Sequence, residues 1–289
     1  MESVLRQTAC QLTSSFFLSP FFNVDFTDQI NRQVSLPSWP PRRIISLVPS
    51  QTELLFSLGL EEAVVGITKF CVHPPAWFTA KQRVGGTKTL NIQKIRTLKP
   101  DLILGNKEEN DRFQIESLMD EFPVWMSDIE NLEDALNMIQ AVGNLTDRRV
   151  QAAALAADIR HRFQVLLESS KPVALTAAYL IWRKPYMAVG RQTFIHDLLG
   201  RAGFTNVFGH LQRYPEVDLA ALAAARPQVI LLSSEPYPFA EKHVQELAVA
   251  CPEAKILLVD GELFSWYGSR LQLASAYFQH LMVMASQRH

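Results

Sequence analysis

The sequence predicts an α/β fold in which two lobes with mostly parallel sheets are joined by one long rigid α-helix. Short apolar runs that suit buried strands alternate with helical patterns in both halves of the chain, and this alternation is typical of parallel sheets. Between the two series, Thr146–Glu168 contains neither Gly nor Pro over about six helical turns. We therefore divide the 289 residues into an N-terminal extension, an N-terminal lobe, a bridging helix and a C-terminal lobe, at 1–24, 25–145, 146–168 and 169–289.

The N-terminal lobe begins with Arg43–Val48, a short apolar and β-branched run that predicts a buried strand. A helix is expected from Pro49, because Ser50 and Glu53 have the spacing of a capping box and Gly59 ends the apolar stripe. The later elements alternate as strand Val64–Thr68, helix Asn91–Leu98, strand Asp101–Gly105, helix Glu108–Glu121, strand Val124–Ser127 and helix Leu132–Val142.

The alternation restarts after Pro172. Its predicted elements are strand Val173–Leu180, helix Thr193–Ala202, strand Val229–Ser233, strand Ile256–Val259 and closing helix Ser269–Ser286. The run Lys-Pro-Asp-Leu-Ile-Leu at 99–104 is echoed by Arg-Pro-Gln-Val-Ile-Leu at 226–231. This echo favours two lobes of related design.

Composition excludes several classes of protein. Hydrophobic residues make up 48% and charged residues 20% of the chain, which is typical of a globular protein. The net charge of −1 offers no basic surface for nucleic acid. The three cysteines Cys10, Cys71 and Cys251 are far apart and odd in number, which disfavours a disulfide framework or structural zinc site. We expect reduced thiols and a monomer.

The N-terminus differs from an export signal. Glu2 precedes Arg6, and the apolar patch at 16–18 is broken by Ser19-Pro20. Gln7 stands where a lipoprotein cleavage site before Cys10 would have an aliphatic residue. We therefore expect 1–22 to be a loose extension or the product of an early start codon, and the protein as encoded to stay in the cytoplasm.

Ligands of open α/β sheets bind beyond the carboxyl ends of strands. The segment after the second predicted strand holds Lys69, Cys71, His73 and Trp77. His73 could ligate a metal centre such as cobalt or iron, or cap the next helix, and the second interpretation is favoured. Trp77 could line a cleft or pack against a helix. The polar run 106–110 after the next strand could line a cleft or be a solvated helix start.

Aromatic side chains follow the strands of the C-terminal lobe in the same way. With polar tips on apolar rings, these side chains would suit a large planar ligand opposite Lys69–His73. Phe264 is the exception, because we expect it to pack between the lobes. The predicted cleft aromatics are Trp182, Tyr186, Tyr237, Trp266 and Tyr267. No nucleophile elbow, phosphate-binding loop or dinucleotide fingerprint occurs, so the pattern favours a binding protein over an enzyme.

The run Arg43–Leu55 resembles the first lobe of the ABC-transporter substrate-binding proteins for cobalamin, haem and iron–siderophores, above all the cobalamin-binding members. Val84–Thr87, Asn91–Ile95 and Leu98–Ile103 extend the resemblance, which covers about 25–289 in order. It implies two Rossmann-like lobes bridged by one rigid helix. It also implies that a small-molecule metal chelate (corrinoid, haem or ferric chelate) binds in the cleft, with no covalent cofactor.

The resemblance assigns roles to single residues. In the cobalamin binders an acid of the last loop meets the ligand, and alignment on Arg270 places Glu262 there. Family members dock an ABC permease through one exposed glutamate on each lobe and are usually periplasmic or membrane-anchored. Glu53 matches the first glutamate, but Ala220 stands at the second, with Glu216 close by. We therefore expect that this protein does not dock a permease as its relatives do.

An enzyme or chaperone of tetrapyrrole or corrinoid handling on the same scaffold is the alternative. An enzyme would show a strongly shifted acid or base in the cleft, whereas a binder would show mainly aromatic side chains.

Overall fold

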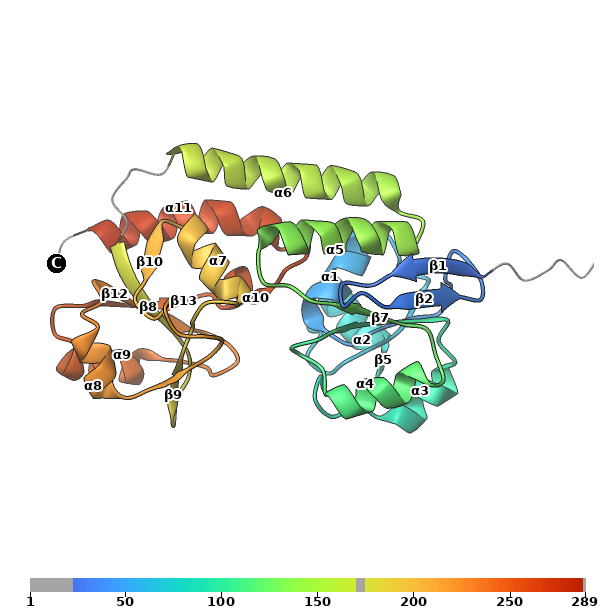
Figure 1. The fold of residues 1–289 in the computed structure, drawn as a ribbon, viewed down its shortest axis with the longest axis horizontal. Coiled ribbons are helices and arrows are strands. Elements are labelled where there is room, and N and C mark those ends of the chain that lie inside the picture. The colour runs from blue at the N-terminus through green and yellow to red at the C-terminus, as the bar shows by residue number, and fades with distance from the viewer. Residues whose placement is uncertain (1–22, 170–174, 288–289) are drawn as a thin grey trace, which may run out of the picture.

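The computed structural model describes residues 23–169 and 175–287 and has the predicted fold: two α/β lobes bridged by a long helix (Figure 1). The predicted extension at 1–22 lies outside the described residues, and the domain bounds at 145 and 168 stay predictions. No helix of the described ranges combines the length and apolar character needed to cross a membrane.

The N-lobe is built on a five-stranded, fully parallel sheet. Its strand order is β5 (Gln82–Arg83), β4 (Val64–Ile67), β3 (Ile44–Ser46), β6 (Leu102–Asn106) and β7 (Val124–Ser127). Its helices are α1 (Pro49–Ser57), α2 (Pro75–Ala80), α3 (Ile92–Leu98), α4 (Arg112–Met119) and α5 (Leu132–Leu145). An antiparallel hairpin, β1 (Val24–Thr27) and β2 (Gln33–Leu36), precedes the sheet.

The C-lobe has a six-stranded mixed sheet. Its main order is β11 (Glu216–Val217), β9 (Tyr186–Ala188), β8 (Leu175–Trp182), β12 (Val229–Ser233) and β13 (Lys255–Val259), and β10 (Phe204–Asn206) also pairs with β8. Only the pairs of β9 with β8 and β11 are antiparallel. Its helices are α7 (Phe194–Arg201), α8 (Leu219–Ala224), α9 (Glu241–Ala250), α10 (Glu262–Ser265) and α11 (Leu271–Ser286).

The bridging helix is α6 (Arg149–Ser169), unbroken as predicted. Its predicted start at Thr146 is wrong, because the Thr146 hydroxyl donates to the Val142 carbonyl (2.7 Å) and caps α5, while Asp147 takes a φ of 55° that breaks the helical path. Arg160 binds Glu133 on α5 (2.8 Å), and Gln272 on α11 donates to Asp158 (2.6 Å). The helix therefore contacts both lobes, as Figure 1 shows.

The sequence predicts an apolar stripe at Val150, Ala154, Ala157, Phe163 and Leu166, of which only the last two are buried in α6. Val150 is 81% exposed, whereas the buried positions are Ala152, Ala156, Ile159, Phe163 and Leu166. These side chains join an apolar cluster that continues from the N-lobe through α5 into α7 and α11. One continuous core therefore links the two lobes and resists large motions between them.

One predicted helix start and one predicted capping box of the N-lobe are wrong in a way that affects the cleft. The Asp111 side chain accepts a hydrogen bond from the Gln114 amide (3.0 Å), so α4 begins at Arg112 and 107–111 connects β6 to it as a loop. The N-cap of α1 is Val48, without a side-chain cap, so Ser50 and Glu53 form no capping box. Glu53 is thereby available for another contact.

Gly143 tests the close packing of α5 on α6. A Cβ at Gly143 would lie 2.3 Å from the Ala152 Cβ, so Gly143→Ala is expected to destabilise the protein by about 1–3 kcal/mol through overpacking. A Cβ at Gly200, on α7, would meet nothing within 4 Å, so Gly200→Ala is the matched control. Urea unfolding compares the two, and equal stabilities would refute tight packing of the bridge.

Candidate functional site

A cleft of about 610 Å³ lies between the lobes. Its N-lobe wall comes from the segments that follow β3, β4, β5, β6 and β7. Its C-lobe wall comes from the end of β8 and the segments that follow β12 and β13, together with the start of α7 and Tyr214. Most of the lining therefore lies beyond the carboxyl ends of strands. The lining residues are Pro49, Ser50, Phe70, Val72, Thr87, Asn106, Glu108, Glu109, Ile129, Ile181, Phe194, Ile195, Tyr214, Glu235, Pro236, Glu262, Ser265, Trp266 and Tyr267.

Arg270 ties the two lobes together at one side of this cleft. Its Nε and Nη2 donate to the Glu53 carboxylate of α1 (3.0 and 2.7 Å), and its Nη1 lies 2.8 Å from Glu262 Oε2. The guanidinium also lies over the Trp266 ring, 4.6 Å from the centroid. Only 12% of the Arg270 side chain is exposed, so these charges meet in a largely dry environment.

His73 joins the same cluster from the N-lobe. Its Nε2 lies 3.4 Å from Glu262 Oε2, and its ring meets Trp266 edge-on at 5.5 Å. Glu262 therefore contacts two side chains, Arg270 of its own lobe and His73 of the facing lobe. Within the described ranges no group of three or more His, Cys, Asp or Glu side chains could hold a metal ion, so metal ligation by His73 stays a prediction.

The loop 106–110 presents Glu109 to the cleft. Asn106 Oδ1 accepts hydrogen bonds from the Glu108 and Glu109 amides (2.9 and 3.0 Å), and Lys88 Nζ donates to the Glu108 and Asn110 carbonyls (2.6 and 3.1 Å). These bonds fix the backbone on both sides of Glu109. The Tyr267 hydroxyl of the C-lobe then donates to Glu109 Oε1 (2.5 Å).

Burial dominates the titration of these two groups. Desolvation raises the pKa of Glu109 to about 7, the Tyr267 hydrogen bond and Lys88 oppose the rise, and the nearby charges of Glu235 and Glu108 add to it. Burial, with the charge of Glu109, raises the pKa of Tyr267. The phenol therefore stays the donor in this contact.

Glu235 is the second half-buried acid of the cleft. Its Oε1 accepts hydrogen bonds from the Ser265 hydroxyl (2.5 Å) and the Trp266 indole (3.0 Å). Burial raises its pKa above the ordinary value, against these two bonds.

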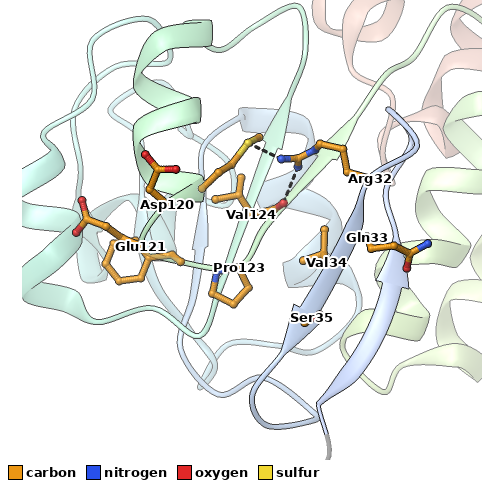
Figure 2. Close-up of a pocket in the computed structure, with 10 residues that line it drawn as sticks. Arg32, Gln33, Val34, Ser35, Asp120, Glu121, Pro123 and Val124 are labelled. Atoms are coloured by element: carbon orange, nitrogen blue, oxygen red, sulfur yellow. Dashed lines mark hydrogen bonds between the residues drawn. The ribbon is translucent and has the colours of Figure 1, made fainter.

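A second hollow, of about 350 Å³, lies between hairpin β1–β2 and the segment that leads into β7 (Figure 2). The basic side chain in this hollow, Arg32, already binds Asp28 (2.6 Å) and the Val124 carbonyl (2.9 Å), and it contacts Met119 Sδ. These bonds attach the hairpin to the N-lobe, which is a sufficient structural role for the residues of this hollow.

With the geometry described, comparison with known proteins identifies the family. The model of the periplasmic binding proteins matches residues 44–248. The chain belongs to the periplasmic binding protein family. A vitamin B12-binding protein of Vibrio cholerae is 28% identical over 200 residues, covering 68% of this chain and 71% of the relative. One of Pectobacterium carotovorum is 25% identical over 240 residues, covering 81% and 86%.

Solved structures share the fold. The crystal structure of the periplasmic vitamin B12 binding protein BtuF of Vibrio cholerae has a TM-score of 0.75 at 24% identity, covering 86% of this chain and 99% of that one. The periplasmic heme-binding protein RhuT from Roseiflexus sp. RS-1 has a TM-score of 0.74 at 21% identity, covering 85% and 99%. These findings confirm the resemblance drawn from Arg43–Leu55 and the two-lobe fold.

Several residues predicted to bind ligand lie outside the lining of this family member's cleft. Cys71 is fully buried with its sulfur between the Thr52 and Thr68 hydroxyls (3.1 Å each). Trp77 is also fully buried and packs edge-on against Phe56. Lys69 is exposed, with Nζ 5.0 Å from the centroid of the Phe70 ring.

The aromatic prediction divides into two groups. Trp266 and Tyr267 line the cleft as expected. Phe264 is fully buried, but its ring packs against Tyr179 and Phe278 of its own lobe and not between the lobes. Tyr186 instead donates to Glu246 (2.9 Å), and the 40% exposed Trp182 meets Tyr237 edge-on at 5.6 Å. None of these three belongs to the cleft lining.

Other lining residues were missed by sequence reasoning. Glu235 and Pro236 had a usable signal, because they directly follow strand β12. For Glu108 and Glu109, a place in the cleft lining was one of the two alternatives that the sequence left open for the run 106–110, and the structure places them there. Tyr214 had none, because the loop between β10 and β11 carries no recognisable pattern.

Proposed function

We propose that this family member is a ligand-binding protein of the ABC-transporter substrate-binding class that holds a corrinoid of the cobalamin type in the interlobe cleft. The observation that carries this proposal is the chemistry of the lining. Apolar and aromatic side chains surround four glutamates, and the described residues of the lining include no Lys or Arg. Such a lining suits a large ligand whose polar groups are neutral hydrogen-bond donors.

Charge separates the candidate chelates. The amides at the periphery of a corrinoid can donate to glutamates, whereas the carboxylates of haem would be repelled by them. The names of the vitamin B12-binding relatives support the same choice. The fold alone does not distinguish a corrinoid from haem as the ligand, because vitamin B12-binding and heme-binding proteins share this fold.

Purification of the untagged protein from its own cell tests this assignment. We expect the absorbance spectrum and the mass of the released ligand to be those of a corrinoid. Release of haem, or of a ferric chelate without a corrin ring, would overturn the assignment.

An enzyme of corrinoid or tetrapyrrole handling remains the second candidate, and Glu109 is the observation that favours it, because shifted acids cluster at catalytic sites. Against it, Glu109 bonds to a phenol that stays protonated, and the named relatives are binding proteins. Incubation with cyanocobalamin followed by mass spectrometry decides between them. We expect unchanged ligand, and a new product would favour the enzyme.

Coupling to a permease has weak support from the surface. Glu53, the counterpart of one docking glutamate, is bound by Arg270, and exposed Ala220 on α8 stands at the position of the other. We infer that this protein does not dock a permease through that pair of charges, and that it stays in the cytoplasm. Cell fractionation with an antibody tests both, and recovery in the periplasm together with a membrane permease would refute them.

A further inference from the structure

Two half-buried carboxylates face the cleft from opposite lobes. Glu109 comes from the loop after β6 of the N-lobe, and Glu235 from the segment after β12 of the C-lobe. Each accepts hydrogen bonds at Oε1 only from neutral groups: Tyr267 for Glu109, and Ser265 with Trp266 for Glu235. Their Oε2 atoms have no hydrogen-bond partner within the described part of the chain.

The nearby cations are engaged elsewhere. Lys88 donates to backbone carbonyls, Arg213 pairs with Glu108 (3.1 Å), and Arg270 binds Glu53 and Glu262. Half-buried carboxylates without a cation lose part of their solvation, and a ligand that donates hydrogen bonds can replace it.

A further polar group lies in the same lining. The Ser50 side chain is 2% exposed, lines the cleft, and interacts with the Tyr267 phenol that binds Glu109. It therefore places a hydroxyl beside the Tyr267–Glu109 contact.

We propose that Glu109 and Glu235 form a subsite that takes an amide N–H donor of the bound ligand between the two lobes. The inference rests on the proposed function, since a corrinoid carries such amides. Hydrogen bonds from the ligand favour the ionised carboxylates over the protonated ones. Ligand binding is therefore coupled to release of protons from this subsite.

The direction of the pH dependence follows from the environment of the two acids. The titratable or charged groups around Glu109 are Tyr267, Glu108, Lys88 and Glu235, with Tyr214 beside Glu108; those around Glu235 are Glu262, Asp260 and Tyr179. The pKa of free Glu109 is about 7 and is lower in the complex, so affinity is highest above neutral pH and falls as pH drops through 7. His73, which faces Glu262, is a further titratable side chain at the cleft, and His73→Gln separates its contribution.

The test titrates the whole chain with cyanocobalamin at about pH 6 and about pH 8. We expect binding about ten-fold weaker at the lower pH for the wild type, because most of the Glu109 side chain is then protonated. Glu109→Gln keeps an acceptor for Tyr267 but cannot titrate. The affinity of this variant for cyanocobalamin should therefore differ by less than about two-fold between the two pH values. Glu62→Gln, on an exposed residue, is the matched control and should behave as the wild type.

Calorimetry at neutral pH in two buffers of different ionisation enthalpy counts the released protons directly. We expect proton release from the wild type and the Glu62→Gln and His73→Gln proteins, and little from Glu109→Gln. Glu235→Gln provides a second test if Glu109→Gln does not fold. Equal affinities at both pH values, or an unchanged pH dependence in Glu109→Gln, would overturn the subsite. Failure to bind cyanocobalamin at either pH would instead overturn the proposed function.

Discussion

Arg270→Ala is expected to lower the free energy of unfolding by about 3 kcal/mol, because it leaves two largely buried carboxylates without their cation. The side chains of Glu53 and Glu262 are 20% and 23% exposed, and each bonds to the Arg270 guanidinium. The substitution also removes the cation from the face of Trp266. Both the interlobe contact and the shape of the cleft depend on this one side chain.

Urea unfolding measures the effect of Arg270→Ala. Arg112→Ala is the control, because its ion pair with Glu116 on α4 is exposed and should contribute little to stability. The triple change of Arg270→Met with Glu53→Gln and Glu262→Gln removes the uncompensated charges and should recover most of the loss. A stability equal to that of Arg112→Ala would mean that the cluster does not hold the lobes together.

Trp266→Ala is expected to weaken cyanocobalamin binding by about 2 kcal/mol, or about 30-fold, because buried aromatic side chains dominate binding energies. Trp266 is 6% exposed, lines the cleft, and donates its indole N–H to Glu235. The substitution removes apolar surface and also leaves Glu235 with one hydrogen bond fewer.

Trp182→Ala is the matched control for this loss. Trp182 was also expected in the cleft, but the structure places it outside the lining with 40% of its surface exposed. Its removal should leave the dissociation constant unchanged within about two-fold. Equal losses from both variants, with folding intact, would show that the ligand extends beyond the described cleft and that its site is misplaced.

The fold was predictable because local patterns agree with the long-range arrangement. The apolar runs at Ile44–Ser46, Leu102–Asn106 and Val229–Ser233 are buried on both faces, and buried parallel strands require such runs. The start of the bridge was not predictable, because Thr146–Arg148 suits a helix by composition. Only the left-handed backbone at Asp147 separates α5 from α6 there.

The site was only partly predictable, because strand ends decide which side chains reach the cleft. The predicted end of β8 at Leu180 placed Trp182 and Tyr186 beyond the sheet. The strand instead continues to Trp182, and β9 returns antiparallel from Tyr186, so both side chains pack on other parts of the C-lobe. Conversely, the side chain of Asp111 moves the start of α4 and brings Glu109 into the cleft.

Calorimetric titration of the purified protein with cyanocobalamin, beside hemin under the same conditions above neutral pH, tests the central claim most directly. The acidic, aromatic lining predicts one cyanocobalamin per chain, bound at least about ten-fold more tightly than hemin, a difference of about 1.4 kcal/mol. Tighter binding of hemin, or no heat of binding with cyanocobalamin, would contradict the proposal that this cleft holds a corrinoid.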